Sequence, residues 1–428
     1  MTGGILFLLM IGLMLLGLPI AIGIGYSSIL YILVTGIKPL LIVGSRLADG
    51  IDSFSFLAIT MFIMAGCMME QYGLSERLIN VSAKLCGNAP GSSGTIAIVA
   101  CAIFAALTGS GAATVVAIGG LTIPMMIDQG YSREEATAVV TTGGALGPLI
   151  PPSITMIVYG TAMGLSVPAM FMGAVIPGLL TMMFLIITNI LLARRRGIKD
   201  QKVHYSAKEK LKALREAILA LLMPVIVLGG IYSGLFTPTE AGAIAVMYCA
   251  FLGVIYRKFT WASFKKICID TVHTSAMVMF IVACASLFGL ILTVAKIPQT
   301  IVTAATTVLT SKIIYLIVLT IIILIVGALL ETNTATLILA PILIPVGLAL
   351  GLDPLHLGVI WCMNLIIGLV TPPFGLNLFT GVSVGQVSFV NLAKKCAPYI
   401  AAQIFALLIC TFWDDVILVL PRLLGMWT

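Results

Sequence analysis

The chain has 428 residues, of which 60% are hydrophobic and 9% are charged, and its mean hydropathy is +1.18. Because a soluble domain carries about 25% charged residues, this composition excludes an ordinary water-soluble globular protein, and it also excludes disordered and nucleic-acid-binding proteins, which need polar or basic surface. The formal net charge is +7, and residues 194–215 account for all of it, with nine basic residues against Asp200 and Glu209.

The first 37 residues carry no charge. We expect them to form a retained membrane segment, because a cleaved signal has a basic leading region and a shorter apolar core. A helix that spans a membrane needs about 20 apolar residues, so the uncharged windows 85–127 and 136–193 are long enough for two segments each. The chain therefore predicts roughly ten to twelve membrane segments, all helical because backbone in hydrocarbon must satisfy its own hydrogen bonds. The other uncharged windows are 53–69, 217–239, 241–256, 271–295, 313–330, 332–352, 354–393 and 396–413.

Two basic stretches predict the orientation of the chain. Residues 194–215 and 257–266 are separated by two apolar segments and therefore lie on the same face, which the positive-inside rule makes cytoplasmic. The stretch 194–215 also suits a helix that lies on the membrane and binds anionic lipid, and the two interpretations are compatible.

An internal repeat becomes visible when the sequence is compared with itself at an offset of 221 residues. Eight Gly or Pro residues fall on an identical residue of the second half, and these two residue types fix the backbone most strongly. Coincidence in a Gly-rich membrane protein is the alternative explanation. The first set is Pro124, Gly130, Gly147, Pro151, Pro152, Gly160, Gly164 and Pro177, and the second is Pro345, Gly351, Gly368, Pro372, Pro373, Gly381, Gly385 and Pro398.

Each copy of the repeat predicts a helical hairpin followed by a broken helix. A polar cluster, at 108–111 or 331–334, interrupts each hairpin, which is typical of the tip of a re-entrant hairpin. Paired prolines interrupt each broken helix, because they remove two amide donors and clash with preceding carbonyls. When the segments are counted from the cytoplasmic loops, the two hairpins start on opposite faces of the membrane, so the two copies are inverted relative to each other. Inverted repeats are typical of secondary transporters.

We therefore predict an all-α polytopic membrane protein with inverted repeats, two re-entrant helical hairpins and two broken helices. The predicted boundaries are a first repeat over 1–193, with its hairpin near 92–127 and its broken helix near 134–163, a basic cytoplasmic loop and linking helix over 194–236, and a second repeat over 237–428, with its hairpin near 313–350 and its broken helix near 355–385.

Neutral oxygen atoms at the tips and breaks predict cation sites. Carbonyls freed by a helix break, together with Ser, Thr and Asn oxygens, suit a hard cation without a buried carboxylate. Acidic residues are scarce in the apolar segments, apart from Glu331 at the second tip and Glu240 near the start of a span, and the three histidines (204, 273 and 356) flank segments or lie in loops. This distribution favours Na+ over H+. We expect two or more Na+ ions, one held by Gly109, Ser110, Gly111, Pro152 and Ser153, and another by Thr332, Asn333, Thr334, Thr371 and Pro372.

Other roles for these residues are less favoured. Ser, Thr and Asn clusters also hydrogen-bond helices together in membrane bundles. Residues 108–111 partly match a Gly-x-Ser-x-Gly nucleophile motif, but the apolar segments around Ser110 contain no His or carboxylate to activate it, so we expect no catalytic residue. A channel is also disfavoured, because channels usually repeat around a pore. The nine cysteines lack metal-binding spacing, and most lie in apolar runs.

The sequence resembles the large membrane subunit of tripartite ATP-independent periplasmic (TRAP) transporters. Four stretches carry the resemblance, which extends over nearly the whole chain: 229–241 (GGIYSGLFTPTEA), 109–111 (GSG), 147–153 (GPLIPPS) and 371–373 (TPP). The resemblance implies an elevator mechanism in the bacterial cytoplasmic membrane, in which a mobile domain that holds both hairpins slides against a fixed scaffold. It also implies Na+-coupled uptake of an organic acid, such as a C4-dicarboxylate or sialic acid, delivered by a periplasmic substrate-binding protein.

The resemblance further implies a small membrane subunit of about four helices, which we expect to be a separate polypeptide because this chain begins directly in an apolar helix. The substrate carboxylate would lie between the two tips, held by hydroxyls and helix N-termini. The residues expected to bind it are Ser110, Thr114, Ser153, Thr334 and Thr336. The alternative function is a stand-alone Na+/organic-anion symporter of related hairpin architecture.

Overall fold

The computed structural model describes residues 2–85, 91–198, 206–308 and 311–427, and every regular element within these ranges is a helix. Nine of the described helices are long and apolar enough to cross a membrane, and six shorter ones are apolar. The chain is therefore an all-α polytopic membrane protein, as its composition predicts. The helices are α1 (Thr2–Leu15), α2 (Ile20–Thr35), α3 (Leu41–Asp49), α4 (Phe54–Gln71), α5 (Leu74–Leu85), α6 (Ser92–Thr108), α7 (Gly111–Asp128), α8 (Arg133–Gly144), α9 (Ile154–Met163), α10 (Val167–Arg195), α11 (Ala207–Tyr232), α12 (Pro238–Ile255), α13 (Trp261–Val294), α14 (Ile297–Val308), α15 (Lys312–Leu329), α16 (Thr332–Ala349), α17 (Pro354–Gly368), α18 (Leu376–Gly385), α19 (Phe389–Phe412) and α20 (Asp415–Leu423).

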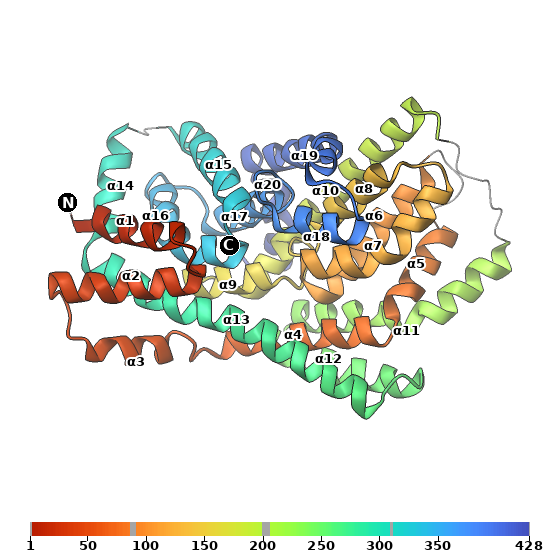
Figure 1. Ribbon diagram of the computed structural model, residues 1–428, viewed down its shortest axis with the longest axis horizontal. Helices are drawn as coiled ribbons and strands as arrows, with labels where there is room; N and C mark the ends of the chain where they lie inside the picture. Colours follow the sequence, from red (N-terminus) through yellow and green to blue (C-terminus); the bar gives the residue numbers. More distant parts are fainter. Residues whose placement is uncertain (1, 86–90, 199–205, 309–310, 428) are drawn as a thin grey trace.

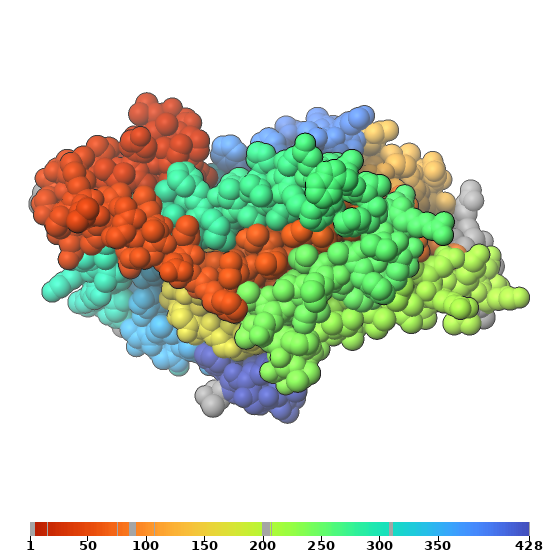
Figure 2. Space-filling model, turned by 90° about the horizontal axis from the view of Figure 1, so that it is seen from below, coloured from red at the N-terminus to blue at the C-terminus, as the bar shows by residue number. Residues whose placement is uncertain are grey.

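The helices are arranged in two parts that lie against each other. One part is a layer that contains α2, α3, α4, α12 and α13, and the other is a thicker body built from α6–α10 and α15–α20 (Figure 1). Within the layer, α4 lies between α12 and α13 and packs on both (Figure 2). The hydroxyl of Thr239 at the start of α12 donates to the carbonyl of Phe54 at the start of α4, at 2.9 Å, which fixes the register of these two helices.

The conspicuous sequence around Pro238 forms a helix start. Thr237 caps α12 by accepting from the Glu240 amide at 3.3 Å, and the Glu240 carboxylate accepts from the Thr237 amide at 2.8 Å. Proline is favoured at the first position of a helix, because its missing N–H has no partner there. The acidic residue Glu240 therefore serves as half of a capping box.

Helix α13 begins earlier than the apolar window 271–295 suggests. Thr260 and Ser263 form a capping box, so the helix starts at Trp261 and runs for 34 residues. At 1.5 Å per residue this is about 51 Å, well beyond the thickness of a hydrocarbon core. The expectation that His273 flanks a segment is therefore wrong, since it lies in the fourth turn of α13. His356 is likewise buried within α17, while His204 falls outside the described residues.

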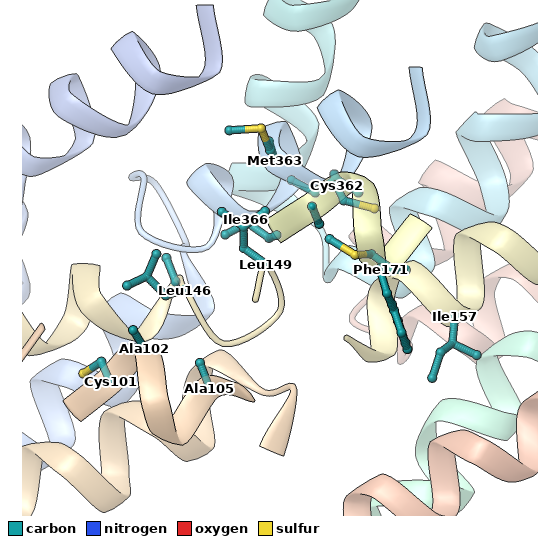
Figure 3. Packing of buried hydrophobic residues seen from close by; sticks show 14 of the residues in the cluster. Cys101, Ala102, Ala105, Leu146, Leu149, Ile157, Phe171, Cys362, Met363 and Ile366 are labelled. Atoms are coloured by element: carbon teal, nitrogen blue, oxygen red, sulfur yellow. The ribbon is translucent and has the colours of Figure 1, made fainter. Parts of the chain in front are cut away.

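Four short connections interrupt the body. We call residues 109–111 the first tip and residues 330–333 the second tip, and residues 145–153 the first break and residues 369–375 the second break. Gly109 has a left-handed backbone (φ 61°), and Ser110 then caps α7. The breaks contain cis peptides at Pro151–Pro152 and Pro372–Pro373. Leu149 of the first break belongs to the buried apolar cluster that also includes Cys101 of α6 and Ile366 of α17, so the break is part of the packed core (Figure 3).

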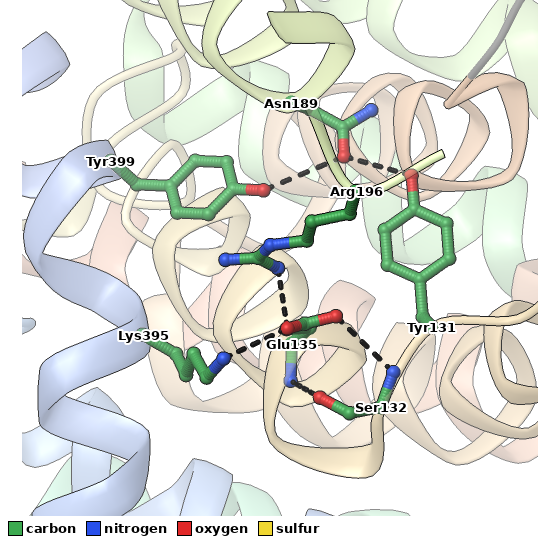
Figure 4. Close-up of polar contacts among 7 residues, drawn as sticks. All are labelled: Tyr131, Ser132, Glu135, Asn189, Arg196, Lys395 and Tyr399. Carbon is green, nitrogen blue, oxygen red and sulfur yellow. Dashed lines mark hydrogen bonds and ion pairs between the residues drawn. The ribbon is translucent and has the colours of Figure 1, made fainter. Parts of the chain in front are cut away.

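A charged cluster lies at the start of α8. The Glu135 carboxylate accepts from the Arg196 guanidinium at 2.6 Å and from the Lys395 ammonium at 2.8 Å (Figure 4). Burial raises the pKa of Glu135, but the hydrogen bonds from Lys395 and Ser132 and the two positive charges outweigh burial and hold the pKa below its ordinary value. Three helices, α8, α10 and α19, are thereby joined at one end.

A second polar group beside this cluster is centred on Asn189 of α10. Its amide oxygen accepts from the hydroxyls of Tyr131, at 3.1 Å, and Tyr399, at 3.5 Å, and its amide nitrogen donates to the carbonyl of Gly91 at 2.8 Å (Figure 4). The start of α6 is thus held to the same end of the body as α8, α10 and α19.

Candidate functional site

A cavity of about 680 Å³ lies where the layer meets the body. Both tips line it from the body, together with the first turns of α9 and α18. From the layer, α4 contributes Glu70 and α13 contributes Lys266, Asp270 and His273. On the side of the body, the wall consists of backbone, hydroxyl and amide groups together with the Glu331 carboxylate, and it faces a wall of the layer that carries charged side chains.

The first tip packs directly on the first break. A Cβ atom on Gly109 would lie 2.7 Å from the Pro152 carbonyl oxygen, and one on Gly147 would lie 2.6 Å from the Ser110 carbonyl oxygen. Only glycine permits such close approach of two backbones. The contact brings the Pro152 carbonyl of the break beside the backbone of the first tip, and such a cluster of neutral oxygens is the kind of surface that a hard cation prefers.

The hairpin of the second tip packs on the second break in the same manner. Gly327 of α15 lies against Gly368 of α17 so closely that a Cβ atom on Gly368 would overlap the Gly327 backbone. The amides of Phe374 and Gly375 both donate to the Ala328 carbonyl at 3.3 Å. The contact thus involves the end of α15, just before the second tip.

The two halves of the chain also meet at the cavity. The hydroxyls of Thr155 in α9 and Thr332 in α16 lie 3.2 Å apart, within hydrogen-bonding distance. On the other side, the amide of Asn377 in α18 lies against Gly111 of α7, where a Cβ atom would be 2.8 Å from its nitrogen. Gly111 and Thr332 correspond at the offset of 221 residues, so each tip contacts the helix that follows the break of the other half.

Residues 7–416 match the family model described as "Tripartite ATP-independent periplasmic transporter, DctM component". The chain belongs to this family. The resemblance found in the sequence is therefore confirmed, and the chain is a membrane component of a transporter and not an enzyme.

Relatives with curated names agree with this assignment. The isethionate TRAP transporter permease protein DctMQ of Oleidesulfovibrio alaskensis is 41% identical over 400 residues, which cover 93% of this chain and 63% of that protein. The chain thus spans less than two thirds of that relative. The C4-dicarboxylate TRAP transporter large permease protein DctM of Vibrio cholerae is 39% identical over 446 residues, which cover 99% of this chain and 98% of that protein.

A solved structure shares the fold at low identity. The YdaH transporter of Alcanivorax borkumensis superimposes with a TM-score of 0.62 over 88% of both chains, at 14% sequence identity. The similarity supports the architecture of the helices alone.

The structure brings some of the predicted site residues to the cavity and not others. Gly109, Ser110, Gly111, Thr332 and Asn333 line it. Pro152 approaches the first tip through its carbonyl. Thr371 and Pro372 of the second break do not line the cavity.

Four hydroxyls predicted to bind substrate lie outside the lining of the cavity and have other partners. The Thr114 hydroxyl donates to the Ser110 carbonyl at 2.7 Å, and the Ser153 hydroxyl donates to the Pro148 carbonyl at 2.5 Å. The Thr334 hydroxyl lies 3.3 Å from the Glu331 carboxylate, and the Thr336 hydroxyl accepts from the Trp361 indole at 3.1 Å. These residues hold the hairpins and the first break in shape.

Glu331 acquires a structural explanation. Its carboxylate caps α16, where it accepts from the Thr334 amide at 3.0 Å and from the side chains of Thr332, at 3.1 Å, and Asn333, at 2.8 Å. A carboxylate at a helix N-terminus is favourable, because the exposed N–H groups and the helix dipole are positive there. The negative charge at the second tip is therefore compensated by its own helix.

Sequence reasoning missed Asn377 and the charged residues of the layer. Asn377 is fully buried, and neither atom of its amide has a hydrogen-bond partner among the described residues. Lys266, Asp270 and His273 follow the helical spacing of three and four residues, so they share one face of α13. The Thr260–Ser263 cap was the signal that could have extended this helix in the sequence.

Proposed function

We propose that the chain couples a Na+ gradient to the uptake of an organic acid that a periplasmic substrate-binding protein delivers. The observation that carries the proposal is the shared construction of the cavity: two hairpins, each packed against a paired-proline break, meet at one cavity with neutral oxygens from both. This arrangement supports binding of Na+ and of a small acid at adjoining positions.

The cross-contacts support inverted repeats with re-entrant hairpins. Gly111 lies against Asn377 and Thr332 lies beside Thr155, so corresponding positions of the two tips each contact the first turn of the helix that follows the break of the other half. In this proposal α6–α7 and α15–α16 enter from opposite faces and meet at the cavity with the first turns of α9 and α18.

Two Na+ positions follow from the same contacts. One Na+ ion would bind the Ser110 hydroxyl with carbonyls of the first tip and of Pro152 and Ser153. A second would bind near Thr332, Asn333 and the second break, where the Asn333 amide oxygen is buried without a partner. Among the described residues, no group of three His, Cys, Asp or Glu side chains could hold a metal ion, so these sites rely on neutral oxygens.

An elevator motion is supported by the position of the cavity between the two parts of the molecule. The body carries both tips and both breaks, while α4 and α13 of the layer supply the opposite wall. Movement of the body along the layer would carry the bound acid past a fixed wall. The hairpins would keep their contacts during this motion, because each hairpin is packed on its own broken helix.

The relatives' names support an organic acid as the substrate and two partners. C4-dicarboxylates and isethionate are both small acids with oxyanion groups. This chain covers only 63% of the isethionate relative, whose name DctMQ joins two letters. The part of that relative beyond this chain supports a small membrane subunit as one partner. We propose the bacterial inner membrane as the location and a periplasmic binding protein as the second partner.

Transport by the reconstituted complex tests the proposal. The chain, its small membrane subunit and its binding protein are placed in liposomes and offered succinate, isethionate or N-acetylneuraminate. We expect uptake of one of these acids under an inward Na+ gradient and none in choline buffer. Equal uptake driven by a proton gradient in choline buffer would contradict Na+ coupling. Uptake by the chain alone would establish the stand-alone symporter instead.

A further inference from the structure

The N-termini of the two hairpin helices that line the cavity are occupied differently. At α16 the Glu331 carboxylate already accepts hydrogen bonds from the helix start, as described above. At α7 only the Ser110 hydroxyl is present, and it accepts from the Ala113 amide at 3.4 Å. Among the described residues, the amides of Gly111 and Ala112 have no acceptor, and both residues line the cavity. The start of α7 is therefore open to an acceptor from outside the chain.

Asn377 provides a second and independent observation at the same place. Helix α18 lies beside α7 in the body, and its first turn carries Asn377 to Gly111 (Figure 1). The Asn377 side chain is fully buried, lines the cavity and has no partner for its amide nitrogen or oxygen. Buried amides are normally hydrogen-bonded, so an unpartnered one in a cavity indicates a missing ligand.

The second tip shows what such a ligand is. There, a carboxylate accepts simultaneously from a helix N-terminal amide, that of Thr334, and from an asparagine side chain, that of Asn333. The first tip has the helix N-terminus and an asparagine amide but no carboxylate of its own. The opposite wall does not attract an anion, since its carboxylates, Glu70 and Asp270, outnumber the single lysine, Lys266. An oxyanion in the cavity therefore has to take its hydrogen bonds from the first tip.

We propose that an oxyanion of the transported acid binds at the N-terminus of α7, where it accepts hydrogen bonds from the amides of Gly111 and Ala112 and from the Asn377 side chain. Glu331 occupies the matching position at α16, so the second tip admits no acid group. The proposal rests on the proposed function and specifies which tip receives the charged end of the substrate. The oxyanion is a carboxylate or a sulfonate, which the acids used in the test distinguish.

Replacement of Asn377 by aspartate tests this site. Asn377→Asp keeps the shape of the side chain but places a negative charge against the substrate oxyanion. We expect uptake of the transported acid to fall at least about tenfold, because one hydrogen bond to a charged group is lost and a repulsion is gained. Stabilisation of the purified complex by NaCl, measured as a rise in melting temperature, should persist.

Asn364→Asp is the matched control. Asn364 is a fully buried asparagine of α17 whose amide oxygen is also unpartnered, but it does not line the cavity. Its replacement should leave the dependence of uptake on acid concentration within about twofold of the wild type. If Asn377→Asp does not yield a folded complex, Asn377→Ala replaces it, with about a threefold loss expected from removal of the hydrogen bond.

The outcomes separate this inference from the proposed function. Wild-type uptake without any need for Na+ contradicts the proposed function. Na+-driven wild-type uptake combined with unchanged uptake by Asn377→Asp overturns the inference alone. A variant with unchanged uptake at saturating acid but half-maximal activation at a lower Na+ concentration also overturns it, because Asn377 would then bind Na+ through its amide oxygen.

Discussion

The two tips follow one construction but end in different chemistry. In both, a hairpin meets a break that contains paired prolines, and glycine permits the close approach of backbones at Gly147 and at Gly368. The second tip carries its own carboxylate, Glu331, whereas the first carries only the Ser110 hydroxyl at the helix start. The shared glycines and prolines maintain the scaffold, and the differing polar residues assign different ligands to the two tips.

The largest expected effect comes from disrupting a tip–break contact. In Gly147→Ala the new Cβ atom would lie 2.6 Å from the Ser110 carbonyl, which forces the first tip away from its break. Overpacking of this kind costs about 1–3 kcal/mol, and the displaced oxygens would no longer bind Na+. We expect Na+-driven uptake to be abolished. Gly120→Ala in the same hairpin, with no atom within 4 Å of its Cβ, should retain full uptake. Normal uptake by Gly147→Ala would show that the contact is dispensable.

A smaller effect is expected from the Ser110 hydroxyl. Ser110→Ala removes one proposed Na+ ligand and the cap of α7, and we expect the Na+ concentration for half-maximal uptake to rise about tenfold. Ser166→Ala is the control, because Ser166 caps α10 in the same manner and lies outside the cavity. It should lower stability comparably while the Na+ dependence stays unchanged. Equal Na+ dependence in both variants would remove Ser110 from the cation site.

Replacement of Glu331 should make the second tip resemble the first. Glu331→Ala removes a helix cap, which costs about 0.5–2 kcal/mol, and lowers the melting temperature of the complex by about 2–4 °C. It also leaves the N-terminus of α16 open, so the transported acid should stabilise the variant more than it stabilises the wild type. Glu240→Ala, which removes the carboxylate half of the α12 capping box away from the cavity, should cause a similar loss without the added stabilisation. The comparison between the tips fails if both variants respond to the acid alike.

The smallest expected effect is a change in stability from a substitution in the first turn of a broken helix, at the end away from the tips. Glu135 of α8 corresponds to His356 of α17 at the repeat offset, and only Glu135 is held in an ion pair. Because the pKa of Glu135 is lowered in the folded state, its contribution to stability is present above its ordinary pKa near 4.5 and is lost as pH falls below that value. Glu135→Gln should therefore melt about 1–2 °C below the wild type at pH 7, and the difference should narrow below about pH 4.5. A constant difference across this range would contradict the assignment.

Much of the fold could be predicted because glycine and proline act locally. The helix end at Gly109 and the interruption of the chain at Pro151 and Pro152 follow from the backbone preferences of those residues and need no knowledge of tertiary contacts, although α8 already ends at Gly144. The sequence did not predict the extra length of α13, because the uncharged window begins only after Asp270. The charged residues before it belong to the helix but lie outside that window. The start of α13 depends on the Thr260–Ser263 cap.

The site was harder to predict, because the side of a helix on which a residue lies depends on packing. Four polar residues in succession, 331–334, cover the whole circumference of a helix at about 100° per residue, so the sequence alone could not select the pair, Thr332 and Asn333, that faces the cavity with Glu331. Thr336 faces Trp361 instead. Asn377 is far from the first tip in sequence, and only the packing of α18 on α7 brings them together.

The central claim is that Na+ and an organic acid cross the membrane together through the cavity between the two tips. The most direct test measures radiolabelled Na+ and radiolabelled acid in the same liposomes that contain the wild-type complex and its binding protein. The account predicts that addition of the acid accelerates Na+ entry in a fixed ratio of two or more Na+ ions per acid, and that Gly147→Ala abolishes both fluxes. Entry of the acid without any accompanying Na+ would contradict it.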